Sequence, residues 1–229
     1  MARIVAGLGA PHSPNLPSVV ERNPAFVENE LYKKLRAHLE SVRADVLVIF
    51  SNDHFNTFFL DNFPLFAVGA APSTWGPNDQ TPMPRHEIPV AEALAAHVHK
   101  TGIEEGFDLA ITQEFSVDHA FTVPWHFVGA GTKLAILPIF VHCFSSTLPA
   151  AARAFELGRA VGRAIRTFPG NERVAVFASV SFSLEIGGPK IQPNDRSGVP
   201  DRKWVARIVE LMQAGKVGDL IGEATPLQL

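Results

Sequence analysis

Short apolar runs alternate along the chain with segments in which apolar residues recur at helical spacing. The runs have the length and the continuous apolar character of strands buried in a parallel sheet. They predict strands over residues 2–10, 45–50, 65–71, 108–111, 134–140 and 173–179. The pattern therefore favours a sheet whose strands are separated in the sequence by helices.

The helices are predicted from this periodicity and from the residues at their starts. Asn23-Pro24 predicts the start of a helix that ends near Arg43, because proline fits the first helical turn. Leu148-Pro149 opens another helix, and residues 90–100 and the end of the chain each predict one more. Asp201 predicts an N-cap for a helix whose inner side holds Trp204, Val205, Ile208, Val209 and Met212.

This alternation predicts an α/β fold, a single three-layer domain with a mixed or mostly parallel central sheet and helices on both faces. Ligand sites in such sheets collect at the carboxyl ends of the strands. Residues 72–89 are rich in proline and predict a long irregular loop. Loops of that length in a compact domain are often functional.

Composition narrows the classes of function. The formal net charge is −3, and no basic block is present that would neutralise nucleic-acid phosphates or an anionic membrane. No stretch approaches the ~18 apolar residues that a membrane span needs. Cys143 is the only cysteine, so a reducing cytoplasm is the expected compartment. Seventeen phenylalanines suit a dry core, the favoured interpretation, or a pocket for a ring-shaped ligand.

Three of the nine histidines stand out because each lies in a loop after a predicted strand. They are His12, His54 and His119. Because a rigid sheet holds its strand ends in place, His12 and His54 form a candidate metal site. The alternative for each is a loop histidine that is hydrogen-bonded to the backbone. Packing, surface or pocket-lining positions explain most of the others, namely His38, His86, His97, His126 and His142.

Common catalytic signatures do not decide the chemistry. The chain contains no HExxH, P-loop, GxSxG or dinucleotide-binding glycine pattern. The segment Ala178-Ser179-Val180-Ser181 lacks the flanking glycines of a nucleophile elbow. The generic motifs therefore leave the activity open.

Four segments, taken in order, resemble one known family. They are Gly7-x-x-x-Pro11-His12-Ser13-Pro14, Asn52-Asp53-His54, Val117-Asp118-His119-Ala120-Phe121-Thr122-Val123-Pro124 and Leu137-Pro138-Ile139-Phe140. The family is that of the class III extradiol ring-cleaving dioxygenases, relatives of the protocatechuate 4,5-dioxygenase β subunit that include the dihydroxyphenylpropionate dioxygenases. The resemblance runs from residue 1 to about residue 220. Each motif is weak alone, but their shared order makes the resemblance specific.

The resemblance implies a non-haem Fe(II) enzyme that opens a catechol ring beside its two hydroxyls with O2. His12 and His54 match the two histidine ligands, and His119 matches a histidine that contacts substrate and oxygen. Asn52 matches a polar residue near the substrate. Two histidines and a carboxylate on one face of Fe(II) leave positions open for the diol and for O2. His119 would then donate or accept a proton as the ring opens.

The chain departs from the family pattern in two places. Phe182 stands where many members have a catalytic histidine, and phenylalanine cannot transfer a proton. Ser181, Ser183 and Glu185 are nearby polar residues, and each is a weak candidate to replace it. The family's third ligand is a glutamate on a later helix, and Glu223 does not match its surroundings. We therefore expect residues 1–229 to form one catalytic domain that lacks a C-terminal segment.

These departures keep two alternatives open, a non-catalytic binding protein on the same scaffold and a zinc hydrolase that uses the same histidines. The expected partners are a small aromatic diol and O2, and the identity of the diol is open. Arg85 or Lys190 could pair with a carboxylate of the substrate, although a surface position is the favoured interpretation for both. The resemblance also implies a homo-oligomer, alone or with a small partner subunit.

Overall fold

A computed structural model describes residues 1–144, 147–182 and 201–224 of the chain. The chain divides into two compact units, which are described separately below. The first comprises Met1–Leu148 and Leu157–Val180, and it contains the sheet. The second comprises Pro149–Glu156 and Ser181–Leu229.

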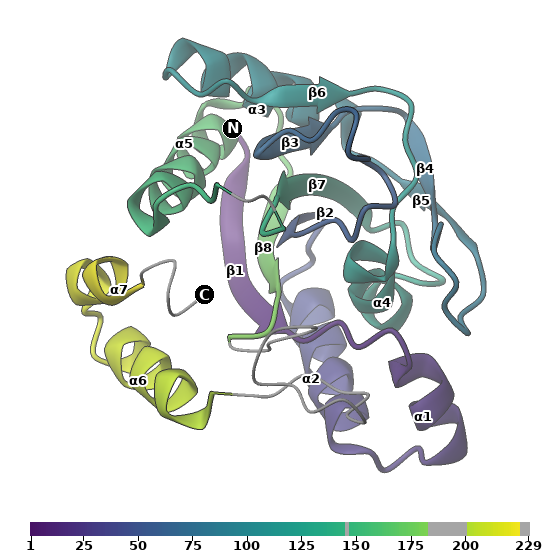
Figure 1. The fold of residues 1–229 in the computed structure, drawn as a ribbon. Helices are drawn as coiled ribbons and strands as arrows, with labels where there is room; N and C mark the ends of the chain where they lie inside the picture. The colour runs from purple at the N-terminus through teal and green to yellow at the C-terminus, as the bar shows by residue number, and fades with distance from the viewer. Residues whose placement is uncertain (145–146, 183–200, 225–229) are drawn as a thin grey trace. The chain divides into compact units, whose positions relative to one another are not determined.

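The first unit is built on a six-stranded sheet with the order β1-β8-β2-β7-β3-β6 (Figure 1). Neighbouring strands run parallel except for β3 and β7, which are antiparallel. The predicted mixed, mostly parallel sheet is therefore confirmed. Its strands are β1 (Arg3–Ala10), β2 (Val46–Ser51), β3 (Phe66–Gly69), β6 (Ala110–Thr112), β7 (Ala135–Val141) and β8 (Arg173–Ser179).

Helices pack on both faces of this sheet, as predicted (Figure 1). Strand β2 shows why its apolar run is continuous, because side chains pointing to opposite faces are both buried. Leu47 and Ile49 join the core under one set of helices, whereas Val46 and Val48 join the core under the other. The first set is α1 (Leu16–Arg22), α2 (Val27–Ser41) and α4 (His119–Val128), and the second is α3 (Glu92–Glu104) and α5 (Ala151–Thr167) from Leu157 onward.

Two local predictions for this unit are wrong. No helix was predicted before Asn23, but residues 16–22 form α1, with a proline in the first turn, where the N–H that proline lacks would have no partner inside the helix. The proline-rich stretch 72–89 contains a two-stranded antiparallel ribbon, β4 (Ser73–Gly76) and β5 (His86–Pro89). A strand of four residues is too short for the alternation of apolar and polar residues to be recognised, so the prolines led to the prediction of a loop.

His119 was predicted to lie in a loop, but it is the first residue of the buried helix α4. The side chain of Asp118 accepts a hydrogen bond from the backbone N–H of Ala120 and so caps the helix. Pro124 lies inside the helix and has no N–H to donate to the carbonyl of Ala120, four residues earlier. The Ala120 carbonyl is therefore free for a partner outside the helix.

The second unit contains α6 (Arg202–Gln213) and α7 (Val217–Glu223). Asp201 caps α6 as predicted, and Trp204 and Ile208 are buried. Val209 and Met212 were expected inside but are 37% and 55% exposed, and Leu211 is buried instead. The true inner face follows the spacing 204, 208, 211, which is the helical period. No helix in the described parts of the chain is long and apolar enough to cross a membrane.

The central strand should dominate the stability of the first unit. Ile49 is fully buried in β2, so Ile49→Ala should lower the free energy of unfolding by about 2–5 kcal/mol. Ile103 on α3 is 49% exposed, and Ile103→Ala should change it by less than about 0.5 kcal/mol. Urea titrations followed by circular dichroism would measure both, and equal losses would contradict the described core.

Candidate functional site

The three predicted histidines are brought to one edge of the sheet by its parallel strands. β1, β8 and β2 run in the same direction, and Ala10 pairs with Ser179 at their carboxyl ends. His12 follows β1 by two residues and His54 follows β2 by three, so their loops leave the sheet at the same edge. His119 is the first residue of α4.

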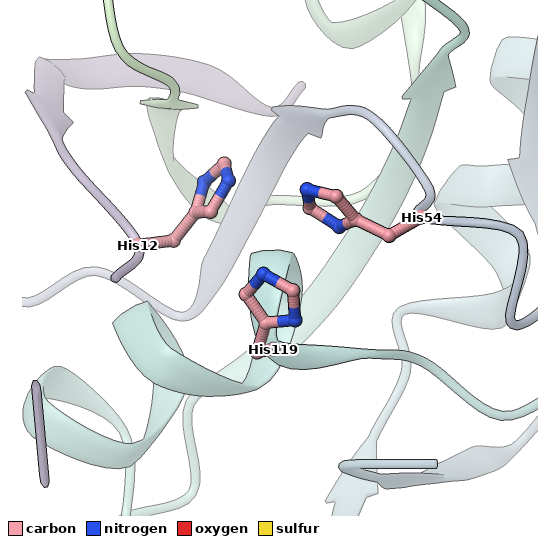
Figure 2. Close-up of side chains that lie close together, drawn as sticks. All are labelled: His12, His54 and His119. Atoms are coloured by element: carbon pink, nitrogen blue, oxygen red, sulfur yellow. The ribbon is translucent and has the colours of Figure 1, made fainter. Parts of the chain in front are cut away.

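The three imidazoles point toward one another (Figure 2). One nitrogen from each ring lies within 4.8 Å of the other two, an arrangement that could hold a metal ion. The rings of His12 and His54 are nearly perpendicular, at 77°, with centroids 5.5 Å apart. The rings of His54 and His119 are instead stacked at 23° and 4.2 Å.

His12 is oriented by Ser179 at the end of β8. The Ser179 hydroxyl donates to the free Ala120 carbonyl at 2.6 Å, so its single proton is used there. Nδ1 of His12, 2.9 Å from the same hydroxyl oxygen, is then the donor in their hydrogen bond. This arrangement leaves the lone pair of His12 Nε2 available. The hydroxyl of buried Tyr32 donates to the Pro11 carbonyl at 2.7 Å and holds the loop before His12.

His54 is oriented by Asp118, which is fully buried. A carboxylate oxygen of Asp118 accepts both the backbone N–H of His54 and its Nδ1–H, each at 2.8 Å. Burial alone would raise the pKa of Asp118, but its hydrogen bonds and the charges of His54 and His119 lower it. Nε2 of His54 faces the amide of Asn52, whose Nδ2 lies 3.1 Å away. Asn52 therefore lies beside the candidate metal position.

His119 is oriented by Asp79, whose Oδ2 lies 2.5 Å from its Nδ1. All three histidines thus have Nδ1 bound to an oxygen, as histidines that bind metals through Nε2 usually do. Sequence reasoning missed Asp79 and Ser179, and it placed Asp118 only as a neighbour of His119. Ser179 could have been found from its position at a strand end, but nothing in the proline-rich stretch marks Asp79.

The charge of the site also fits a cation. Burial, followed by the neighbouring His119 and His54, lowers the pKa of His12 to about 4. His12 is therefore neutral at pH 7, which is the form that binds a metal. Imidazole nitrogens suit zinc, copper, iron and nickel. The donor set therefore fits a metal ion of this group.

Aromatic rings flank the histidines on one side. The ring of Phe144 lies 5.6 Å from that of His54 and 5.4 Å from that of Phe55, between centroids. Phe63 stacks on Phe55 at 5.1 Å. This part of the site therefore offers an apolar, aromatic surface beside the candidate metal position.

Two of the other histidines lie away from this group, because His86 and His126 hydrogen-bond to each other at 2.8 Å. His142 is buried on the aromatic side of the site, against the rings of Phe58 and Phe63. The guanidinium of Arg85 lies over the ring of Trp75.

Some of the residues at which the chain departs from the family pattern lie in the described part of the structure. Phe182 is 42% exposed, whereas Ser183, Glu185 and Lys190 lie outside the described residues. Glu223 forms an ion pair with Arg207, in agreement with a surface helix position.

Comparison with known proteins relates the chain to a family of enzymes. A family model described as "Catalytic LigB subunit of aromatic ring-opening dioxygenase" matches residues 7–225. A Klebsiella pneumoniae protein named 2,3-dihydroxyphenylpropionate/2,3-dihydroxicinnamic acid 1,2-dioxygenase is 29% identical over 187 residues, 80% of this chain and 58% of that protein. A Pseudomonas putida protein of the same name, numbered 2, is 33% identical over 171 residues, 72% and 52% respectively. This chain spans about half the length of these curated relatives.

The buried carboxylate of Asp118 should control metal affinity. Asp118→Asn and Asp118→Ala both remove the charge behind His54, so metal affinity should fall about 10- to 100-fold. Each also leaves buried N–H donors without an acceptor, so the free energy of unfolding should fall by about 1–3 kcal/mol. Calorimetric titration with Co(II) and urea unfolding would measure these quantities.

A matched control separates the two effects. Asp201→Ala removes the cap of α6 and should cost similar stability while leaving metal affinity unchanged. Wild-type affinity in both Asp118 variants would contradict the role given to this carboxylate.

Proposed function

The chain belongs to the family of the catalytic LigB subunit of aromatic ring-opening dioxygenases, and on this basis we propose that it is a non-haem Fe(II)-dependent extradiol dioxygenase acting on a catechol-type aromatic. The observation that carries the proposal is the convergence of His12, His54 and His119, each with Nδ1 bound to an oxygen. When bound, Fe(II) would bring the diol and O2 together and lower the pKa of a diol hydroxyl.

His12 and His54 are proposed as the metal ligands. A metal ion lies near the plane of each imidazole that binds it, because the nitrogen lone pair lies in that plane. The nearly perpendicular planes of His12 and His54 can meet at one such point. The plane of His119 is inclined by 64° to that of His12, so the different role of His119 is proposed from its family-like motif and not from ring orientation.

His119 is proposed as the catalytic acid–base residue. Its Nδ1 is bound by Asp79, so its Nε2 is the atom that can accept a proton from a diol hydroxyl and return it as the ring opens. With phenylalanine at position 182, His119 is the residue to which we assign this proton transfer.

Asn52 and the neighbouring aromatic rings are proposed to bind the diol. The Asn52 amide lies beside Nε2 of His54, within reach of a hydroxyl at the metal position. The rings of Phe55 and Phe144 offer apolar surface for the aromatic ring of the substrate. The substituents on that ring are open.

The third metal ligand, the oligomeric state and the cellular location are proposed from the resemblance to the family. A carboxylate is proposed as the third ligand, from outside the described residues, because the candidate ligand group found among residues 1–144, 147–182 and 201–224 contains histidines alone. A single catalytic domain, a homo-oligomer, alone or with a small partner subunit, and a cytoplasmic location are proposed on the same basis, the last supported by the single cysteine.

Ring opening should be directly observable. Protein loaded with Fe(II) under anaerobic conditions, then given catechol, protocatechuate or dihydroxyphenylpropionate and air, should consume O2 and form a yellow ring-opened product. Metal removal by a chelator should abolish both signals. Stoichiometric Fe(II) binding without O2 uptake on any diol would favour a non-catalytic binding protein, and ester hydrolysis without O2 uptake would favour a hydrolase.

The proposed roles predict different failures in histidine variants. His12→Ala and His54→Ala should lose Fe(II) binding and activity together. His119→Ala should keep its Fe(II) but lose about 10²- to 10⁴-fold in kcat, the usual contribution of a proton-transferring residue. The control is His97→Ala, at a partly exposed position where the ring contacts Thr167 and Phe168. Loss of iron from His119→Ala would show instead that His119 is a ligand.

A further inference from the structure

Asp79 forms the shortest of the three hydrogen bonds that orient the histidines. Its Oδ2 lies 2.5 Å from His119, against 2.8 Å between Asp118 and His54 and 2.9 Å between Ser179 and His12. The side chains of Asp79 and His119 are 12% and 11% exposed, so little water competes for this bond.

The segment that carries Asp79 is held firmly against the site. The backbone N–H of the preceding residue, Asn78, donates to the Val117 carbonyl at 3.0 Å. The Asn78 side-chain amide donates to the Asn56 carbonyl at 3.0 Å and to the Ser116 hydroxyl at 2.9 Å. Asp79 is therefore tied to the loop that follows His54 and to the segment that leads into α4.

The second carboxylate oxygen of Asp79 shows that the burial of this side chain depends on its bond to His119. Oδ1 is buried and has no hydrogen-bond partner among the described residues. An ionised carboxylate can only accept hydrogen bonds, and a buried one that loses its donor is strongly destabilised. The arrangement therefore favours the proton of neutral His119 on Nδ1, where it serves Asp79.

We propose that Asp79 is a positioning residue that fixes His119 as the Nδ1–H tautomer, with the lone pair of Nε2 facing the metal site. The tautomer follows from the geometry around Asp79, whereas its importance for turnover rests on the proposed dioxygenase function. In the other tautomer, Nε2 would carry a proton and could not accept one from a diol hydroxyl. Asp118, although adjacent in sequence, is occupied by His54 and by the helix cap.

The tautomer can be measured in the metal-free protein. Long-range ¹H–¹⁵N spectra of protein labelled with ¹⁵N-histidine distinguish the two tautomers, and His119→Gln identifies the signals of His119. The wild type should show Nδ1–H, and Asp79→Ala should show a mixture of tautomers. Asp79→Asn keeps an amide oxygen that can accept from Nδ1 and should retain the wild-type tautomer. The exposed Asp61 supplies a control variant, Asp61→Asn, which should match the wild type.

Turnover gives an independent measure. Asp79→Ala should lower kcat about 10- to 100-fold while KM for the diol and the Fe(II) content stay near wild type. Asp79→Asn should recover most of kcat.

An Nε2–H tautomer in the wild type would overturn the inference, even if Asp79→Ala fails to fold. So would a wild-type tautomer or a wild-type kcat in a folded Asp79→Ala. If no diol is turned over by the wild type while the tautomer follows Asp79, the positioning role stands and the proposed function fails.

Discussion

The arrangement of the site depends above all on the buried carboxylate of Asp118. It caps α4 through the N–H of Ala120 and accepts both the backbone N–H and the ring N–H of His54. A carboxylate with no solvent exposure is costly to bury unless it is hydrogen-bonded. The helix start that places His119 and the rotation of His54 are therefore stabilised together by one ionised group.

His12 is joined to the same helix by an irregularity in its hydrogen bonding. A proline inside a helix removes a bond to the carbonyl four residues earlier, which normally destabilises the helix by about 3 kcal/mol. Here the carbonyl left free by Pro124 belongs to Ala120, and it accepts a hydrogen bond from the hydroxyl of Ser179. Ser179 can then only accept from His12, so this irregularity in α4 favours the Nδ1–H tautomer of His12, in the loop after β1.

The sequence predicts best the elements that show a clear pattern, such as a continuous apolar run or a capping residue before a helix. β2 was predictable because all of its core-facing positions are apolar, and α6 because Asp201 stands at its start. The ribbon β4–β5 and the helix α1 were not, because both are short and contain prolines that fit either a loop or an element end. His12, His54 and His119 were marked by strand ends and family-like motifs. Asp79 carries neither signal, since its role comes from a contact with a residue 40 positions away.

The electrostatics of the site explain why its carboxylates bind the far sides of the rings. Burial, followed by the neighbouring His119 and His54, lowers the pKa of His12 to about 4, so His12 adds no positive charge to the group at pH 7. Asp118 and Asp79 bind the outer nitrogens, Nδ1, of His54 and His119. Each carboxylate makes its imidazole a better electron donor without occupying a position at the centre.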